Sequence, residues 1–304
     1  MQMTLHHVAL ASPKAPEAVD FYSTDWGLHE VGREDGTVRL GASRDVGEDY
    51  SLVLVISEKK AVDHFCLVTP ERERFDEVRA RIEERGVPIL EDIPCCPGMT
   101  EGFHFVDLEG RRVEFALRTP PAEGPDPAEL PDAVPAFLAH IVLNSGNIEK
   151  ATEWYCDILG FAVREWRAQD MSFLYSNRDH HTVAFNRAPH PSLNHVAWEM
   201  PELNQFFRHI GRASRTKTGE KLYGPGRHGP GDYIFCYFLD PMEFICECET
   251  DGVKVDDPAD FPFRVLEYSK ESLDQWMGVL SGGKSPRFRE AALGRPDEGL
   301  IPTD

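Results

Sequence analysis

Short segments in which apolar residues alternate with polar ones recur four times along the chain. They are LHHVAL at 5–10, HFCLV at 64–68, LAHIVL at 138–143 and HVAWE at 195–199. Alternation of this kind predicts β-strands with one buried face. Each segment carries a histidine near its start, and these are His7, His64, His140 and His195. The pattern therefore predicts four strands that each hold an imidazole.

Helices are expected after the first and the third of these strands. EAVDFYSTDWGL at 17–28 aligns with EKATEWYCDILGF at 149–161. Gly27 stands near the end of one segment and Gly160 near the end of the other. Glycine commonly ends a helix because it adopts positive φ without strain. The two segments predict equivalent helices in two parts of the chain.

The positions of these residues repeat along the chain at a constant offset. Five pairs differ by 133 positions: His7 and His140, Tyr22 and Tyr155, Gly27 and Gly160, Asp107 and Asp240, Glu114 and Glu247. His64 and His195 differ by 131, a slip that a loop absorbs. A repeat at fixed spacing indicates a duplicated unit. The sequence predicts two halves, each of two strand–helix–strand–strand–strand modules.

The duplication divides the chain into four parts. Residues 1–118 form an N-terminal domain of two modules, which we expect to be non-catalytic, and residues 136–252 form a C-terminal domain of two modules, which we expect to be catalytic. The stretch TPPAEGPDPAELPDAVP at 119–135 is too rich in proline for helix or sheet and is the predicted linker. Residues 253–304 follow as a tail.

Composition and charge narrow the class of protein. The chain has 304 residues, enough for two domains, and no apolar run approaches the ~18 residues that span a bilayer. The start MQMTLHHVAL does not resemble a signal peptide, so we expect a cytoplasmic protein without membrane contact. The net charge of −20 opposes binding to nucleic acid but not to a small anionic substrate. Seven cysteines without a CxxC pair suit a reducing compartment.

Each half offers two strand-borne histidines and one glutamate as candidate metal ligands. The sets are His7, His64 and Glu114, and then His140, His195 and Glu247. Two imidazoles and one carboxylate form the facial triad typical of non-haem iron(II) oxygenases. A cation would also stabilise the charge of Glu247 within the apolar stretch FICECE. The N-terminal set is either a second metal site or a relic of the duplication, and we favour the relic.

Glu249 competes with Glu247 for the role of the carboxylate ligand. It lies two residues further along the strand and hence on the same face. The offset of 133 relates Glu247 to Glu114 but relates Glu249 to Ala116. The repeat therefore favours Glu247.

Only the C-terminal half adds acid–base groups to its candidate ligands. His228 precedes Tyr237 by nine residues, and the positions that correspond to them in the first half are Cys95 and His104. His181 is a further candidate, and we expect its neighbour His180, like His190, to be solvated. If the loop shifts by one residue, His180 replaces His181.

The chain resembles the vicinal oxygen chelate superfamily, and its C-terminal half resembles the type I extradiol ring-cleaving dioxygenases. Two motifs carry the resemblance: His228…Tyr237-Phe-Leu-Asp240-Pro241…Glu247, and His181-Thr-Val-Ala-Phe185. GPGRHG at 224–229 is especially like the catechol and homoprotocatechuate 2,3-dioxygenases. The resemblance implies an α+β fold of four βαβββ modules, in which each pair forms a curved sheet around a cavity.

The resemblance also implies a role for each site residue. His140, His195 and Glu247 would bind iron(II) or, less often, manganese(II). His181 would be the acid–base catalyst, Tyr237 would hydrogen-bond a substrate oxygen, and His228 would assist from the rim. The substrates would be a small aromatic diol of the catechol type and O2, and the product a muconic semialdehyde. Homo-oligomers, tetramers among them, are common in this family.

Three departures from the family pattern concern the turn and the substrate. Glu243 stands where a glycine is usual, Cys236 precedes Tyr237 in place of an aliphatic or aromatic residue, and Tyr223 replaces a carboxylate-binding arginine of the homoprotocatechuate enzymes. In the resembling enzymes, tails cover the mouth of the pocket. Candidates for such contacts here are Arg264, Trp276, Arg287 and Arg289; the alternative is a helix that packs on a neighbouring subunit.

Three other functions fit the same scaffold. A glyoxalase-like isomerase would normally use four protein ligands, whereas each half here offers three. A hydroquinone-type dioxygenase shares the two-His-one-Glu set without an evident need for His228 and Tyr237. A non-catalytic small-molecule binder would need aromatic walls rather than four strand-borne histidines.

Overall fold

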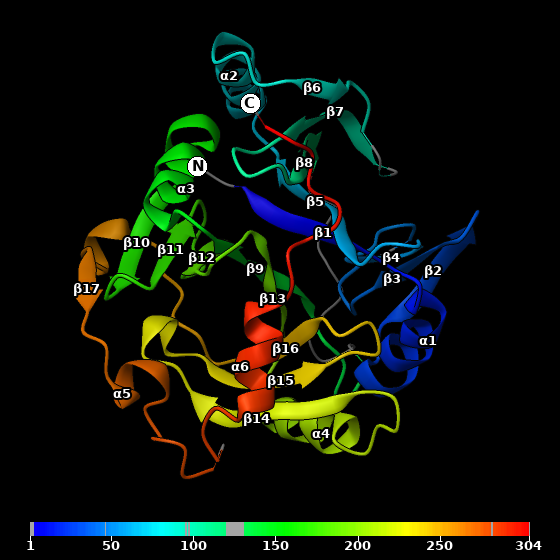
Figure 1. Ribbon diagram of the computed structural model, residues 1–304, viewed down its shortest axis with the longest axis vertical. Coiled ribbons are helices and arrows are strands. Elements are labelled where there is room, and N and C mark those ends of the chain that lie inside the picture. Colours follow the sequence, from blue (N-terminus) through cyan, green and yellow to red (C-terminus); the bar gives the residue numbers. More distant parts are fainter. Residues whose placement is uncertain are drawn as a thin grey trace.

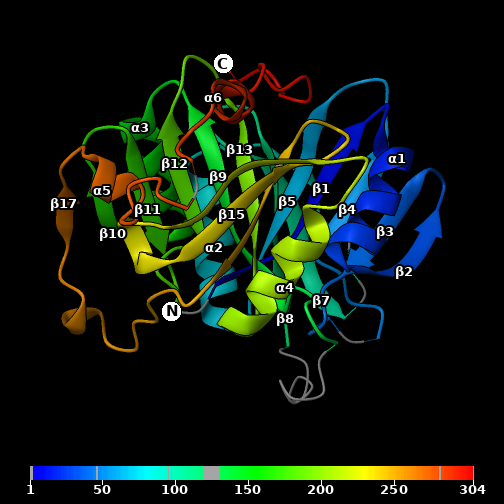
Figure 2. The ribbon, with the colours of Figure 1, turned by 90° about the horizontal axis from the view of Figure 1, so that it is seen from below.

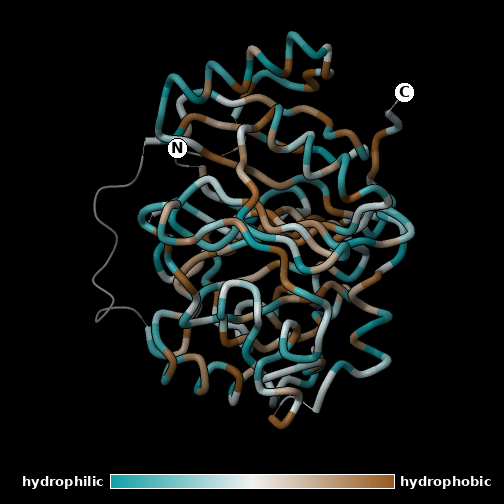
Figure 3. The backbone as a smooth tube through the Cα atoms, turned by 90° about the vertical axis from the view of Figure 1, so that its left-hand side faces the viewer, coloured by the Kyte–Doolittle hydropathy of each residue, from teal (hydrophilic) through white to brown (hydrophobic). Residues whose placement is uncertain are grey.

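The computed structural model describes residues 3–45, 47–94, 96, 98–119, 131–280 and 282–303. Two curved mixed sheets of eight and nine strands dominate it, and the helices lie against them (Figure 1). This arrangement confirms the predicted α+β fold of tandem modules. Figure 3 shows the apolar stretches running mainly along the inner strands, with hydrophilic residues on the outer turns.

The first sheet consists of two βαβββ modules. The first module comprises β1 (Thr4–Ser12), α1 (Ala15–Asp20) continued by the π-helix η1 (Phe21–Trp26), β2 (His29–Glu34), β3 (Thr37–Gly41) and β4 (Leu52–Ile56). The second comprises β5 (Ala61–Thr69), α2 (Arg72–Glu84), β6 (Ile89–Glu91), β7 (Met99–Val106) and β8 (Arg112–Arg118). The strand order β2-β3-β4-β1-β5-β8-β7-β6 places the two histidine-bearing strands, β1 and β5, at the centre.

The second sheet repeats this plan and gains one strand. Its third module comprises β9 (Phe137–Ser145), α3 (Ile148–Trp154), the π-helix η3 (Tyr155–Leu159), β10 (Ala162–Arg167), β11 (Met171–Tyr175) and β12 (Val183–Arg187). Its fourth comprises β13 (Ser192–Glu199), α4 (Leu203–Ala213), β14 (Glu220–Arg227), η4 (Pro230–Asp232), β15 (Ile234–Leu239) and β16 (Ile245–Thr250). The order is β14-β15-β16-β13-β9-β12-β11-β10-β17.

The tail returns to the second sheet. It contains η5 (Pro258–Asp260), β17 (Arg264–Leu266), α5 (Lys270–Leu273) and α6 (Pro286–Leu293). Strand β17 pairs in parallel with β10 and so extends the sheet. Helix α6 lies across the strands of the second half in Figure 1.

The predicted helix ends are confirmed. Gly27 ends η1 with φ of 94°, and Gly160 ends η3 with φ of 77°, both in the left-handed region. The sequence did not predict that each helix would widen into a π-helical turn, which occurs at the same point of both repeats.

β-Bulges interrupt the central strands of both sheets, and the two that adjoin candidate ligands lie at different positions of the repeat. In the pairing of β1 with β5 the register shifts between Leu5 and His7, so that His6 is the extra residue. In the pairing of β9 with β13 it shifts between Leu193 and His195, at Asn194. A bulge changes the alternation of side chains locally, so that a residue and its neighbour reach the same surroundings. Both bulges adjoin candidate ligands.

Residues of the repeat join the two halves. Tyr22 of the first half donates a hydrogen bond to Asp240 of the second (2.9 Å), and Tyr155 of the second donates to Asp107 of the first (2.9 Å). One hydrophobic core includes residues from both sheets, with the rings of Trp26 and Trp198 5.8 Å apart. Figure 2 shows the strands of both halves running through this shared body, with α4 in front of them.

The proposed division into domains stays a prediction. The boundary between the two sheets falls in the expected linker 119–135, of which residues 120–130 lie outside the described part. Within the described residues, no helix is long and apolar enough to cross a membrane.

Candidate active site

Three predicted ligands converge at the centre of the second sheet. His195 Nε2 lies 3.0 Å from Glu247 Oε2, His140 Nε2 lies 3.5 Å from the same oxygen, and the two Nε2 atoms are 3.3 Å apart. The strands β9, β13 and β16 are neighbours, and Ala197 of β13 pairs with both His140 and Glu247. The register of the sheet therefore brings the three side chains to one point, where all are buried.

This donor set fits a divalent cation. Neither carboxylate oxygen of Glu247 accepts a hydrogen bond from a described residue, although the side chain is fully buried. Burial opposes its ionisation, but the imidazoles of His140 and His195 hold the pKa of Glu247 well below its usual range. Burial likewise disfavours charge on His140, yet Glu249 and Glu247 raise its pKa to about 10. Such a site needs positive charge, which a metal bound to two nitrogens and one oxygen provides.

Neighbouring groups fix the orientation of both histidines. His195 Nδ1 donates to Asn194 Oδ1 (2.8 Å), which leaves its Nε2 to face Glu247. Glu249 Oε1 lies 3.4 Å from Nδ1 of His140, on the side of the ring away from Glu247. Carboxylates and amides in this position orient metal-binding histidines. The two competing glutamates thus occupy different positions. Glu247 lies next to the Nε2 atoms of both histidines, whereas Glu249 lies next to Nδ1 of His140.

The predicted acid–base groups surround the same point. His228 Nδ1 donates to the carbonyl of Leu273 (2.9 Å), so its Nε2 can accept the hydroxyl hydrogen of Tyr237 (2.9 Å). The same Nε2 lies 3.4 Å from Glu247 Oε1. His181 is buried with its ring centroid 4.1 Å from that of His140, and burial holds its pKa well below the usual value. The structure brings His181, Tyr237 and His228 together with the three candidate ligands.

The expectation that His180 is solvated is wrong. Its side chain is fully buried, and its Nε2 lies 2.9 Å from Glu165 Oε1. The tail causes this burial, because Arg264 of β17 also pairs with Glu165 and the ring of Phe261 lies 5.5 Å from that of His180. His190, also expected to be solvated, is half-buried. Since His180 faces Glu165 and His181 lines the cavity, the geometry favours His181 for contact with a substrate.

A cavity of about 410 Å³ opens beside the candidate ligands. The sheet contributes its inner wall, and the tail contributes Tyr268, Leu273, Lys284, Phe288, Arg289, Ala292 and Leu293. Of the four tail residues considered from sequence, Arg289 alone is among the described lining residues. Arg264 pairs with Glu165, Arg287 lies near Glu220 and Glu243, and Trp276 packs against the core.

Basic groups gather in one part of this cavity. Arg167, Lys284 and Arg289 all line it. Burial and the charges of Arg167 and Arg289 lower the pKa of Lys284 to about 8. Burial also lowers the pKa of Arg167, although the charge of Asp170 opposes this effect. Asp170 lines the same cavity, so the three basic groups there outnumber the acidic group that acts on them.

The two departures from the family pattern near the cavity have structural explanations. Glu243 adopts φ of 65°, so it keeps the left-handed turn geometry in which Gly110, its counterpart in the repeat, has φ of 90°. Tyr223 donates to Asp274 Oδ2 (3.3 Å), and its ring packs 5.2 Å from that of Phe288. Tyr223 is therefore part of an aromatic wall that holds α6.

The N-terminal set is also brought together, with different neighbours. His7 Nε2 lies 3.0 Å from His64 Nε2 and 3.9 Å from Glu114 Oε2. The groups of three donors that the described residues form here are His6–His7–Cys96 and His7–Cys66–Glu114. His64 belongs to neither, and metal binding by the predicted set stays a prediction.

Sequence reasoning did not identify several residues of the site. Asn194 precedes His195, and consecutive residues on a regular strand face opposite sides of the sheet. The contact between them depends on the bulge at Asn194, which the sequence pattern did not predict. Arg167 and Lys284 are far apart in the chain and meet only in the folded structure. An isolated arginine or lysine in a sequence gives no indication of such a meeting.

Comparisons with known proteins agree with this geometry. A family model described as the glyoxalase/bleomycin resistance protein/dioxygenase superfamily matches residues 4–115 and 137–247. Metapyrocatechase 2 of Cupriavidus necator is 26% identical over 66% of this chain and 68% of its own. The manganese-dependent 2,3-dihydroxybiphenyl 1,2-dioxygenase of Geobacillus genomosp. 3 is 22% identical over 90% of this chain and 92% of its own.

Solved structures share the fold over nearly the whole chain. A Mn(II)-bound glyoxalase from Novosphingobium aromaticivorans superimposes with a TM-score of 0.86 and 28% identity, covering 99% of this chain and 97% of that one. Homoprotocatechuate 2,3-dioxygenase from Arthrobacter globiformis gives a TM-score of 0.79 with 20% identity, covering 98% and 95%. At that identity the second likeness shows the fold alone.

Proposed function

Because the chain belongs to the glyoxalase/bleomycin resistance protein/dioxygenase superfamily, we propose that it is an extradiol dioxygenase. It cleaves the ring of a catechol-type substrate next to the diol and places both atoms of O2 in a muconic semialdehyde product. The observation that carries this proposal is the convergence of His140, His195 and Glu247 beside the Tyr237–His228 pair. The names of the two curated relatives support it.

In this proposal His140, His195 and Glu247 hold the metal, iron(II) or alternatively manganese(II). The metal supplies chelation of the vicinal diol and redox coupling between the diol and O2. Asn194 and Glu249 keep the two imidazoles in position for it. A cytoplasmic homo-oligomer remains our prediction for the working form of the protein.

Tyr237 and His228 act on the substrate's hydroxyl proton. Since the hydroxyl hydrogen of Tyr237 is directed at His228, the phenolic oxygen can accept a hydrogen bond from the substrate. The substrate's proton passes to Tyr237 as the tyrosine's own proton passes to His228, so the diol becomes the more electron-rich catecholate. The Leu273 carbonyl fixes the tautomer of His228 that this transfer requires.

His181 stands on the other side of the site and moves a second proton. It is buried beside His140 and lines the cavity. A neutral imidazole there can take up a proton from the substrate and return it when the ring opens. We assign the acid–base role to His181 rather than to His180.

We further propose that the substituent of the catechol is acidic. Arg167, Lys284 and Arg289 line the cavity, and an anionic group beside them would offset their charge. A carboxylate held there would fix the distance between the substituent and the diol. The residue at the position of the family's arginine, Tyr223, donates instead to Asp274.

A glyoxalase-like isomerase is the second candidate, favoured by the likeness to the Mn(II)-bound glyoxalase. Two glutamates, Glu247 and Glu249, flank His140, which would suit a site with more than one carboxylate. However, Glu249 lies behind the ring of His140 and is not in the three-donor group. The catechol reaction therefore explains more of the observed contacts.

The test compares substrates and two matched variants. The chain is purified anaerobically, loaded with iron(II) or manganese(II), and offered catechols with and without acidic substituents, as well as a hemithioacetal. We expect oxygen uptake and a yellow product with the catechols. Glu247→Gln should lose the metal and the activity, whereas Glu249→Gln should keep the metal with about 10- to 100-fold lower affinity or activity.

Two results would contradict the proposal. Turnover of the hemithioacetal without oxygen uptake on any catechol would establish the isomerase instead. Loss of metal in Glu249→Gln with full retention in Glu247→Gln would assign the ligand role to the other carboxylate. Circular dichroism of both variants shows whether the fold is intact.

A further inference from the structure

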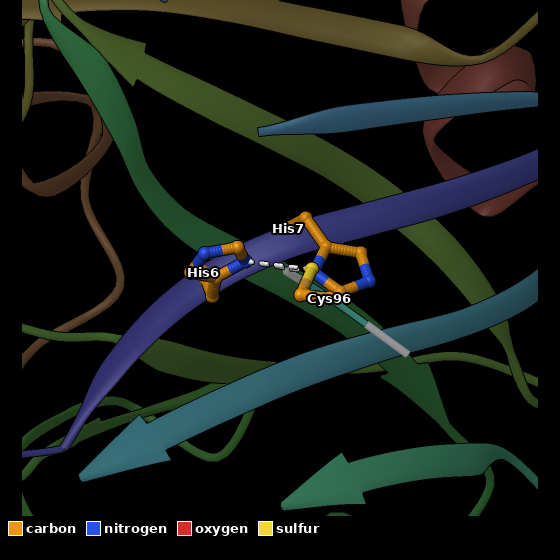
Figure 4. A group of neighbouring side chains, drawn as sticks. All are labelled: His6, His7 and Cys96. Atoms are coloured by element: carbon orange, nitrogen blue, oxygen red, sulfur yellow. Dashed lines mark hydrogen bonds between the residues drawn. The ribbon is translucent and has the colours of Figure 1, made fainter. Parts of the chain in front are cut away.

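A second group of donor atoms lies in the N-terminal half. Nδ1 of His6 and Nδ1 of His7 are 2.8 Å apart, and Sγ of Cys96 lies 3.7 Å and 3.6 Å from them. Figure 4 shows the thiol and the two rings directed at one another from β1 and from the segment before β7. All three side chains are buried.

The bulge in β1 creates this group. His6 and His7 are consecutive, and on a regular strand their side chains would face opposite sides of the sheet. The register shift between Leu5 and His7 turns His6 to the side of His7. In the second half the equivalent shift is at Ala139, and the position equivalent to Cys96 is Gly229. The second half therefore lacks two of the three donors, and the group is not a copy of its centre.

The ring nitrogens on the far sides of both histidines face other groups. Nε2 of His6 donates to Asp49 Oδ1 (2.8 Å). His64 donates from Nδ1 to Asp63 Oδ2 (2.7 Å), so its Nε2 accepts from Nε2 of His7 (3.0 Å). Nδ1 of His6 and Nδ1 of His7 face each other at 2.8 Å, so a cation beside both could bind the two rings together.

The distances to the sulfur fit a particular kind of cation. Zinc binds thiolate sulfur at about 2.3 Å and imidazole nitrogen at about 2.0 Å, which places S and N about 3.5 Å apart in a tetrahedron. The observed S–N separations are 3.6 Å and 3.7 Å. The same geometry requires about 3.3 Å between the nitrogens, so the rings would separate by about 0.5 Å on binding. The carboxylate behind His6 is a usual partner of a zinc-bound histidine.

We propose that His6, His7 and Cys96 form a zinc(II) site in the N-terminal half. Nδ1 of each histidine and the thiolate of Cys96 bind the ion, the thiol releases its proton to solvent, and water takes the fourth position. The donors of this site include a soft thiolate, whereas the site of His140, His195 and Glu247 has only nitrogen and oxygen. The thiolate therefore distinguishes the two sites by ligand type, since soft thiolate ligands favour zinc.

The experiment uses cobalt(II) as a spectroscopic probe of thiolate ligation. The full chain, reduced and metal-free, is titrated with cobalt(II) and then with zinc(II). We expect a thiolate-to-cobalt charge-transfer band with the intensity of one thiolate-bound ion per chain, which disappears as zinc replaces cobalt. Because the other centre has no sulfur ligand, this band reports the N-terminal site alone. The outcome does not depend on catalytic activity.

Matched variants decide whether the proposed residues are the ligands. Cys96→Ser should abolish the band, whereas Cys156→Ser, which removes a half-buried cysteine elsewhere, should retain it. His6→Ala installs the residue of the other half and should weaken cobalt binding at least 100-fold. If Cys96→Ser does not fold, as judged by circular dichroism, His6→Ala decides alone. Absence of the band in the folded wild type, its persistence in Cys96→Ser, or unchanged affinity in His6→Ala would each overturn the proposal.

Discussion

The charge of Lys284 depends on its surroundings in the cavity. It is half-buried, and the nearby guanidinium groups of Arg167 and Arg289 add to the effect of burial, which places its pKa at about 8. An ammonium group in this position is charged below that pH and neutral above it. Its attraction for an anionic substituent is therefore lost as the pH rises.

This property predicts a pH dependence of substrate selection. The kcat/KM for a catechol with a carboxylate side chain should fall as the pH rises through about 8, because Lys284 then loses its proton. Lys284→Arg, which stays protonated, should shift this decline to higher pH, and Lys284→Met should lower kcat/KM below about pH 8 and remove the decline. Steady-state rates against pH measure the effect.

Unsubstituted catechol is the internal control for Lys284. It carries no anion for the ammonium group, so its pH profile should be the same in Lys284→Arg and in the wild type. An identical shift for both substrates would mean that Lys284 acts through the fold rather than through the substituent.

Helix α6 is the element that connects the tail to the candidate metal centre. Ser285 caps it by accepting from the amide of Phe288, and Pro286 stands in its first turn. Asn194 donates to the carbonyl of Ala292 (3.0 Å) while its own oxygen accepts from His195. One side chain thus links the end of the helix to a candidate metal ligand.

Phe288 attaches the same helix to the aromatic wall. Its ring lies 5.2 Å from Tyr223 and 5.1 Å from Tyr237. Phe288→Ala should raise KM about 10-fold or more with a smaller change in kcat, because α6 covers the cavity less tightly. The lost packing should also cost about 3–5 kcal/mol of local stability. Steady-state kinetics and protease resistance of the tail measure the two effects.

The matched control on α6 is Glu290→Ala, because the side chain of Glu290 is 77% exposed. It should leave KM and protease resistance unchanged. Equal effects of the two substitutions would mean that α6 is sensitive to any change and that Phe288 has no special contact.

At the scale of the whole molecule, the two halves exchange equivalent hydrogen bonds. Tyr22 donates to Asp240 and Tyr155 donates to Asp107, each across the boundary between the halves. The two carboxylates differ in their other partners. Asp107 also accepts from Arg111, whereas Asp240 otherwise accepts from the amide of Phe244. Burial raises the pKa of Asp240 to about 7.

This difference predicts unequal costs for two equivalent substitutions. Tyr22→Phe should destabilise the protein by about 1–3 kcal/mol, because it removes a donor from a buried carboxyl group that has few others. Tyr155→Phe should cost about 1 kcal/mol or less, because Arg111 still compensates Asp107. Thermal unfolding of both variants at one pH measures the order. A larger loss in Tyr155→Phe would contradict this account.

The sequence by itself determined the architecture and the identity of the candidate ligands. The offset of 133 residues predicted two equivalent halves, and Gly27 and Gly160 predicted the ends of two helices. These features are local: the pleat of a strand fixes which side chains share a face, and glycine permits a left-handed residue at a helix end. His140, His195 and Glu247 were recognisable because the repeat carried the same residue types to equivalent strands.

Only the tertiary structure decided which neighbours those residues have. A bulge moves Asn194 beside His195 and His6 beside His7, which strand periodicity alone excludes. The returning tail buries His180, and the fold brings Lys284 to Arg167. Contacts of this kind depend on the register between strands and on the packing of distant segments. The alternation of apolar and polar residues along one strand predicts neither the register nor the packing, because it reflects only which face of that strand is buried.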